Sequence, residues 1–195
     1  MRGLMSKSSV SSAVAKSVLL VVFGAIFILG IFFFLMRAKE ASGGEEDYDL
    51  TEVDKITTTN LDKNYPADPR NVVELYLQTM KVLYNEKYSD DQQKKMLTVM
   101  AGLLDDELMA QQNDFYKSMA NEIKVRKDDG YSFSTYQVKN YEPDVVTLND
   151  GNKMCEVETY YSLMKGATRE NTYYTFYMRR DSEKRWKILG WVPKK

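Results

Sequence analysis

The chain has 195 residues, a formal net charge of −1, no histidine and one cysteine. Histidine is the side chain that most readily exchanges protons near pH 7, and without it one cysteine cannot supply the usual nitrogen and sulfur ligands of zinc. The single cysteine also excludes an intrachain disulfide, and the near-neutral charge gives no support to nucleic-acid binding.

The first element expected along the chain is an uncharged, apolar run over residues 17–36. About 20 helical residues cross the hydrocarbon core of a bilayer, so we expect this run to form a transmembrane helix that contacts lipid. A cleaved export signal is the alternative, but its apolar core is usually shorter and ends at a small-residue cleavage site. Here Arg37 and Lys39 follow directly.

The tail that precedes this run, residues 1–16, is serine-rich and carries three basic residues and no acidic one. Basic residues also follow the run, so the positive-inside rule comes close to a tie. The short basic tail favours a cytoplasmic N-terminus. We therefore expect a single-pass protein of the cell membrane with its C-terminal domain outside the cytoplasm; the reverse orientation is the alternative.

An acidic stretch follows, because the segment between Lys39 and Pro66 has eight acidic residues against three lysines. Such a composition buries too little apolar surface to offset the entropy of ordering. Residues 37–65 are therefore predicted to be a flexible linker, with an acidic docking segment as the alternative. Residues 66–195 are long enough for one folded domain.

The first part of this domain has helical periodicity. Asp68 can cap a helix that begins at Pro69, and Ser89 with Gln92 matches the capping-box pattern at the start of a second helix. A third helix is expected from Asp105, where acidic residues suit the positive end of the helix dipole. Cation binding by these acidic residues is the alternative.

The second part alternates with period two, which is typical of strands. Five strands are expected, at residues 131–141, 144–148, 153–164, 171–180 and 185–192. Asp150 and Gly151 predict a two-residue hairpin with positive φ at both positions. Because all strand connections are short, neighbours should pair antiparallel. The chain is thus predicted to be α+β, with a transmembrane helix and then three helices packed on a curved antiparallel sheet of four to five strands.

Helices followed by a meander that closes with "YYTFYMRRDSEKRWKILGW" resemble the nuclear-transport-factor-two-like superfamily, in which a curved sheet wraps a long first helix into a cone. Adding a tail, a span and a spacer makes the architecture similar to the bitopic component of type IV secretion and conjugation systems. It is equally similar to uncharacterised single-span bacterial proteins. The resemblance implies a cone between the first helix and the sheet, whose lining would include Tyr76, Met80 and Trp186.

Catalytic residues are not evident. Enzymes of that superfamily place an acid or base in the mouth of the cone, but no aspartate or tyrosine of this chain stands in a recognisable motif, and there is no glycine-rich phosphate loop. Cys155 has no histidine to activate it and is expected to be a small core residue. We expect no catalysis, no cofactor and no metal site. A small-ligand or enzymatic pocket of the hydrolase or isomerase type is the alternative.

A contact surface for a partner is expected on the last strands, where aromatic and basic side chains gather. Its predicted residues are Tyr160, Tyr173, Tyr177, Arg179, Arg180 and Arg185. An ordinary amphipathic sheet is the alternative for the tyrosines, and simple solvation is the alternative for the arginines. The function expected from the sequence is a membrane-anchored scaffold or interaction module of a bacterial envelope with a protein partner. Self-association stays open.

Overall fold

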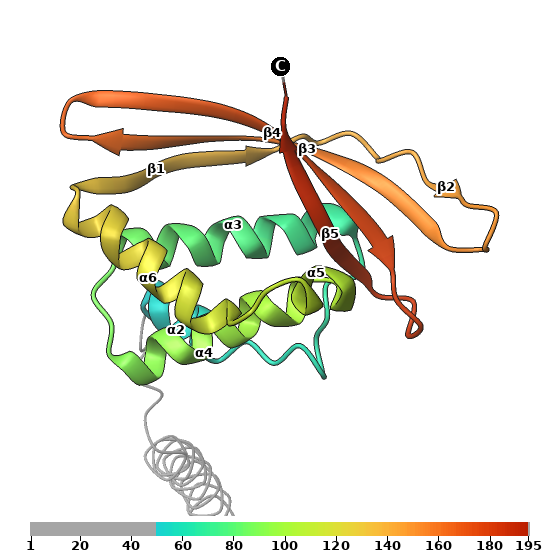
Figure 1. Ribbon diagram of the computed structural model, residues 1–195, viewed down its shortest axis with the longest axis horizontal. Coiled ribbons are helices and arrows are strands. Elements are labelled where there is room, and N and C mark those ends of the chain that lie inside the picture. The colour runs from blue at the N-terminus through green and yellow to red at the C-terminus, as the bar shows by residue number, and fades with distance from the viewer. Residues whose placement is uncertain (1–49, 195) are drawn as a thin grey trace, which may run out of the picture. The chain divides into compact units, whose positions relative to one another are not determined.

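Helices cover one face of a curved antiparallel sheet in residues 50–194, the part of the chain that the computed structural model describes (Figure 1). The predicted α+β class is confirmed. The helices are α2 (Glu52–Thr57), α3 (Pro69–Asn85), α4 (Asp90–Leu103), α5 (Asp106–Ala110) and α6 (Phe115–Asp128). The strands are β1 (Tyr131–Val138), β2 (Val146–Thr147), β3 (Lys153–Lys165), β4 (Thr168–Arg180) and β5 (Trp186–Pro193).

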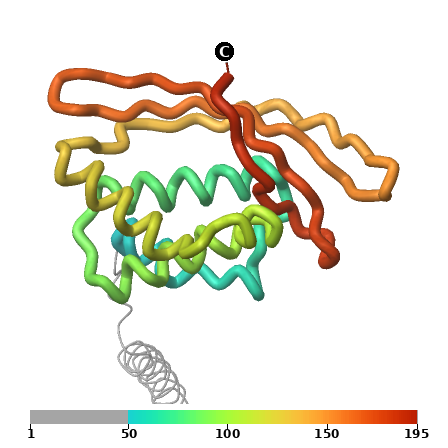
Figure 2. Tube along the Cα trace, viewed as in Figure 1, coloured from blue at the N-terminus to red at the C-terminus, as the bar shows by residue number. Residues whose placement is uncertain are grey.

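The sheet has the order β1-β3-β4-β5, and β2 also pairs with β3. All pairings are antiparallel, as predicted. Since β4 occupies one edge of β3, β1 and β2 follow one another along its other edge, β1 beside residues 159–165 and β2 beside Lys153 and Met154. The helix α3 lies against β1, although the two are far apart in the sequence (Figure 2).

Helices α3 and α4 begin where the sequence predicts. The Asp68 side chain accepts a hydrogen bond from the Arg70 backbone N–H at 2.8 Å, with Pro69 in the first turn of α3. Ser89 and Gln92 form both hydrogen bonds of the capping box at the start of α4. The apolar stripe of α3 is buried between the sheet and α4, so these two caps position the central helix of the domain.

The predicted third helix is two helices, α5 and α6, and the described residues hold five helices rather than three. The break falls between Ala110 and Phe115. Asp114 starts α6 because its side chain accepts a hydrogen bond from the Lys117 backbone N–H at 3.0 Å. A cap of this kind satisfies a backbone N–H that an uninterrupted helix would pair internally. The helical backbone is therefore interrupted here, although the helical spacing of the apolar residues suggests one continuous helix.

The linker predicted over residues 37–65 is corrected for its second half, which is part of the folded domain. Helix α2 buries Val53 and Ile56, and Leu61 packs against Gly102 of α4, where an added Cβ would meet Leu61 Cδ1 at 2.7 Å. The Tyr65 hydroxyl donates a hydrogen bond to the Trp186 carbonyl at 2.7 Å. Two well-spaced apolar residues suffice to dock this short helix, although its surroundings are acidic.

Among residues 50–194, no helix has the length and apolar character that crossing a bilayer requires. The predicted tail (1–16), the predicted span (17–36) and the first half of the predicted linker lie outside the described residues. The transmembrane segment and the orientation therefore stay predictions.

Hairpin turns differ in detail from the expectation. The Asp150–Gly151 hairpin forms, but only Gly151 has a positive φ, of 83°. The Gly151 N–H donates to the Leu148 carbonyl, and the Leu148 N–H donates to the Asn152 carbonyl. This is a type I turn followed by a left-handed residue, which suits the strand twist as well as the expected primed turn does. At Gly166 (φ 58°) a tight two-residue turn lets β4 begin at Thr168 instead of residue 171.

The turn between β4 and β5 has the same hydrogen bonds as the Gly151 turn, but Lys184 (φ 64°) occupies the left-handed position. A residue with a side chain costs about 1–2 kcal/mol in this left-handed conformation. Glycine avoids that cost, but it loses more conformational entropy on folding, which offsets roughly half of the stabilisation. We expect Lys184→Gly to raise the free energy of unfolding by about 0.5–1 kcal/mol in a denaturant titration. Gly151→Ala, the matched change in the other turn, should lower it by a similar amount. A neutral or destabilising Lys184→Gly would contradict this account.

Candidate functional site

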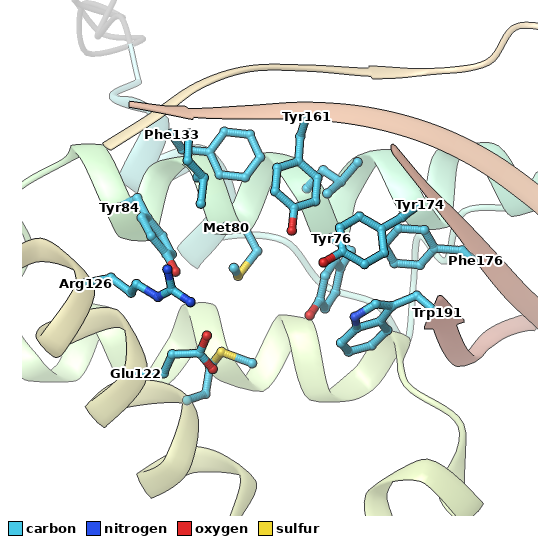
Figure 3. A pocket seen from close by; sticks show the side chains of 13 residues that line it. Tyr76, Met80, Tyr84, Glu122, Arg126, Phe133, Tyr161, Tyr174, Phe176 and Trp191 are labelled. Carbon is cyan, nitrogen blue, oxygen red and sulfur yellow. The ribbon is translucent and has the colours of Figure 1, made fainter. Parts of the chain in front are cut away.

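A cavity of about 200 Å³ lies between α3, α6 and the face of the sheet that the helices cover (Figure 3). Side chains from α3, α6 and four strands line it, so both layers of the fold supply its walls. The lining residues are Tyr76, Leu77, Met80, Tyr84, Met119, Glu122, Arg126, Phe133, Tyr161, Leu163, Tyr174, Phe176 and Trp191.

Aromatic rings of the sheet form one wall. Tyr161 of β3 stacks on Tyr174 of β4 with ring centroids 5.3 Å apart and planes at 5°, and Phe133 of β1 stacks on the other side of Tyr161 at 5.3 Å. Alternate residues of a strand share a face, and these positions all face the helices. Tyr76 of α3 closes one end, with its ring centroid 5.7 Å from that of Trp191. The rings hold one another in place and leave the space between them open.

Tyrosine hydroxyls give the cavity its polar groups. Figure 3 shows the hydroxyls of Tyr76, Tyr161 and Tyr174 directed into the cavity, with that of Tyr84 near its mouth. Burial raises the pKa of Tyr76, Tyr84 and Tyr161 above the ordinary value for tyrosine, and the carboxylate of Glu122 adds to this for Tyr76 and Tyr84. These hydroxyls therefore stay protonated at physiological pH and can donate and accept hydrogen bonds.

Helix α6 places two opposite charges at the mouth. Glu122 and Arg126 stand four residues apart, so they share one face of the helix. Glu122 is exposed, and Arg126 is half-buried with its guanidinium carbon 5.2 Å from the centre of the Tyr131 ring. Within residues 50–194 no ion pair joins the two side chains. Figure 3 shows Arg126 beside the Tyr84 hydroxyl and Glu122 directed toward the cavity.

The predicted cone lining is brought together in part. Tyr76 and Met80 line the cavity, whereas Trp186 does not: it is buried elsewhere, 3% exposed, with the Arg180 guanidinium 5.0 Å from its ring centre. Trp191 takes the place expected for Trp186. Trp186 begins β5 and lies away from the cavity along the strand. A register shift brings Trp191 to the cavity face, because Tyr177 pairs with Gly190 and the next residue, Met178, pairs with Ile188.

Leu189 is the extra residue of that β-bulge, and it reverses the inside–outside alternation of β5. Trp191 therefore faces the same side as Ile188, which strict alternation would forbid. Sequence reasoning also missed Glu122 and Arg126, since an acidic and a basic residue four apart on a helix usually form a solvated pair. Strand alternation puts Tyr161 on the buried face with Val157 and Thr159, but alternation does not show the open space beside its ring.

The tyrosines of the predicted interaction surface lie on the sheet face opposite the cavity. Tyr160 and Tyr173 are cross-strand partners with ring centroids 5.1 Å apart, and the Tyr160 hydroxyl donates to Asn171 Oδ1 at 3.0 Å. Tyr177 alternates with Tyr173 along β4 and lines a shallow cleft with Tyr141 and Cys155. Whether a partner binds these tyrosines stays a prediction.

The three arginines of that surface have partners within the domain. Arg179 pairs with Asp105 and Glu107, acidic residues at the start of α5. Arg185 pairs with Asp181 and Glu183, and Arg180 lies over Trp186. These contacts hold the start of α5 to β4 and close the β4–β5 turn. The guanidinium groups thus take part in the fold, and all three line one polar surface pocket. Whether a partner binds them stays a prediction.

Other candidate centres in residues 50–194 are weaker. Cys155 is buried, and burial raises the pKa of its thiol to about 12, which makes it a poor nucleophile at neutral pH. No group of three or more histidine, cysteine, aspartate or glutamate side chains in this part of the chain could hold a metal ion. The aromatic cavity with its two-charge mouth is the candidate site.

The fold and the cavity define the domain as an α+β module with one ring-lined cavity between its helices and its sheet. The chain belongs to the family described as domain of unknown function (DUF6715), whose model matches residues 5–191. No curated protein matches the chain.

Among solved structures, the chain is similar to the NMR solution structure of the transfer protein TraH from the Gram-positive conjugative plasmid pIP501. The sequences are 15% identical, the TM-score is 0.36, and the match covers 71% of this chain and 96% of TraH. A likeness at this level carries no argument about function. Membership of the nuclear-transport-factor-two-like superfamily stays a prediction.

Proposed function

We propose that the protein is a non-catalytic ligand-binding module that is tethered to the cell membrane and holds an apolar group of its ligand in the aromatic cavity. The observation that carries the proposal is the cavity of about 200 Å³ walled by rings. An apolar cavity of about 150 Å³ can bind benzene, so a single ring or a branched aliphatic group fits here. Because of this cavity, the small-ligand pocket, which is the alternative interpretation of the sequence, is better supported than the scaffold.

The non-catalytic part of the proposal rests on residue chemistry. A tyrosine whose hydroxyl keeps its proton can orient a ligand but cannot remove a proton from it. Burial raises the pKa of Tyr76 and Tyr161, which are among the deepest polar groups of the cavity. Glu122, the one carboxylate of the lining, is exposed at the mouth and lacks the buried setting that usually prepares a catalytic acid.

Ring-only compounds test the cavity. Trp191 lines it and Trp186 does not, so in a Trp186→Phe background the fluorescence of the single remaining tryptophan reports on occupancy. We expect p-cresol or benzyl alcohol to change that fluorescence saturably in the full chain held in lipid nanodiscs. Leu163→Phe, or separately Met80→Phe, should fill part of the cavity and weaken binding by about tenfold. The added side chain would exclude part of the ring of the bound compound, which would then bury less apolar surface.

Tyr173→Phe, on the opposite face of the sheet, is the matched control and should leave binding unchanged. Near-UV circular dichroism of each variant establishes that it is folded. If binding is unchanged in both Leu163→Phe and Met80→Phe, or if the parent chain does not bind these compounds, the cavity is not a ligand site.

The tether is proposed from the apolar run at residues 17–36, which has the length of a membrane span. The full chain should remain in the membrane fraction after alkaline carbonate extraction. Protease added to intact cells should digest the C-terminal domain if it lies outside the cytoplasm. Release by carbonate would remove the tether from the proposal, and protection from protease would reverse the orientation.

A protein-binding scaffold of a bacterial envelope is the second candidate, and the segment around β2 favours it. Four large apolar side chains of this segment are exposed: Tyr141, Val145, Val146 and Leu148. Exposed apolar side chains that gather along one sheet edge are typical of a protein contact. Crosslinking in native membranes through residue 145 tests this candidate, and recovery of uncrosslinked chain alone would count against it.

A further inference from the structure

We propose that the ligand of the cavity is a free α-amino acid with an apolar side chain, held with its side chain among the rings and its ammonium and carboxylate groups between Glu122 and Arg126. This inference rests on the proposed ligand-binding function and adds the chemical class of the ligand. It is carried by the paired charges of α6 and by the neutral, ring-lined space behind them.

A ligand with a single charge fits the mouth poorly. A cation would be attracted by Glu122 and repelled by Arg126, and an anion would meet the reverse. Because both side chains project from one face of α6, a ligand that carries both charges close together can satisfy both at once. A free α-amino acid has this arrangement, since its ammonium and carboxylate groups are attached to the same carbon.

Neither charge is committed to a strong partner in the fold. No ion pair of Glu122 occurs within residues 50–194, and Arg126 contacts the Tyr131 ring, 5.2 Å from its guanidinium carbon. A direct pair between the two, four residues apart on a helix, would be worth only about 0.2–0.5 kcal/mol. A zwitterion can therefore insert between them at little cost.

The interior selects the side chain. Tyr161 and Tyr174 of the sheet direct their hydroxyls into the cavity. Leu77, Met80 and Met119 add apolar surface to its lining. The hydroxyls keep their protons, so the cavity behind the mouth is uncharged. Burying a charged side chain in such a space is costly without a partner. The volume of about 200 Å³ admits a phenyl or branched aliphatic group.

Four probes distinguish the parts of this proposal: L-phenylalanine, N-acetyl-L-phenylalanine without the ammonium group, L-phenylalaninamide without the carboxylate group, and benzyl alcohol with neither. Binding is measured through Trp191 fluorescence in the full Trp186→Phe chain in nanodiscs. L-phenylalanine should bind roughly tenfold more tightly than either blocked derivative, the usual effect of one lost charge-assisted hydrogen bond. L-lysine and L-glutamate should not bind.

Variants of Glu122 and Arg126 assign the charges. Glu122→Gln should weaken the binding of L-phenylalanine by about tenfold but should not weaken that of N-acetyl-L-phenylalanine, because this derivative has no ammonium group and its carboxylate loses a repulsive neighbour. Arg126→Met should weaken the binding of L-phenylalanine similarly but should not weaken that of the amide, whose ammonium group loses a repulsive neighbour. Lys124→Gln, on the exposed side of the same helix, is the control and should have no effect.

The outcomes separate this inference from the proposed function. If benzyl alcohol binds and L-phenylalanine binds no more tightly than its blocked derivatives, the amino-acid inference is wrong and the apolar cavity stands. If Glu122→Gln and Arg126→Met bind L-phenylalanine as tightly as the parent chain does, the assignment of the charges is wrong. If none of the four probes binds, both the inference and the proposed function fail.

Discussion

Arg179→Leu is expected to lower the free energy of unfolding of the domain by about 3–5 kcal/mol, the cost of leaving a buried charge without its partner. The buried charge is Asp105, whose side chain is 6% exposed, against 25% for Arg179. Arg179 binds both carboxylate oxygens of Asp105, with its Nε 3.0 Å from Oδ2. Replacing the guanidinium with an apolar side chain removes both hydrogen bonds and leaves the carboxylate in place.

Asp105 is more than an ion-pair partner, which is why it stays buried. Its side chain accepts a hydrogen bond from the Glu107 backbone N–H at 3.0 Å and so caps α5. Its own backbone N–H donates to the Ile188 carbonyl of β5 at 2.9 Å. The neighbouring ion pair between Arg179 and Glu107 adds little, because Glu107 is largely exposed.

The measurement is equilibrium unfolding in urea with far-UV circular dichroism. Arg169→Leu is the matched control: it removes an exposed arginine from the same strand that has no ion pair among the described residues, and it should change stability by less than about 0.5 kcal/mol. Adding Asp105→Asn to Arg179→Leu should restore much of the loss, since an amide can still cap α5 without burying a charge. Equal stabilities of the two arginine variants would show that the Asp105 pair is not important for folding.

Much of the sheet could be predicted because strand signals are local. Strand alternation and short connections predict the four longer strands, and the helically spaced apolar residues that begin at Val72 predict α3. Trp191 was not predicted to line the cavity, because strict alternation does not allow for the bulge at Leu189. Gly190 beside it is the local signal, since an isolated glycine within a strand often marks a bulge. One extra residue in a strand moves every later side chain to the other face.

The cavity itself is beyond sequence reasoning for a different reason. Strand alternation puts Tyr161 and Tyr174 on the face that the helices cover, but a pattern of apolar faces predicts contact and not how completely the contact fills space. The open volume lies between the aromatic rings of the sheet and the helices α3 and α6. Glu122 and Arg126 become candidate site residues only because they face that volume, which the sequence does not reveal.

The α2 segment shows how composition can mislead. The predicted linker is acidic as a whole, although residues 50–65 hold only three acidic residues against two lysines. The entropy argument for a solvated spacer counts apolar residues over the whole stretch. The structure depends instead on which residues share a face: Val53 and Ile56 are three apart, so both reach the core from one side of a short helix. Two buried side chains and the Tyr65 hydrogen bond are enough to hold the segment on the domain.

Ile56→Ala is accordingly expected to destabilise the domain by about 2–5 kcal/mol, the range for truncating a large buried aliphatic side chain. Ile56 is 1% exposed, whereas Leu50, just before the same helix, is 48% exposed. Leu50→Ala should therefore cost less than about 0.5 kcal/mol, although it removes as much apolar volume. Both are measured by urea unfolding of the full chain.

The comparison separates two physical descriptions of residues 50–65. If the segment is part of the core, its two aliphatic residues differ in cost because only Ile56 leaves a cavity when shortened. If the segment is a solvated spacer, both changes are neutral and the domain begins after it. A difference of several kcal/mol would also mean that the chain between a membrane span and this domain is shorter than its acidic composition suggests, because α2 ties residues 52–57 to α3 and α4.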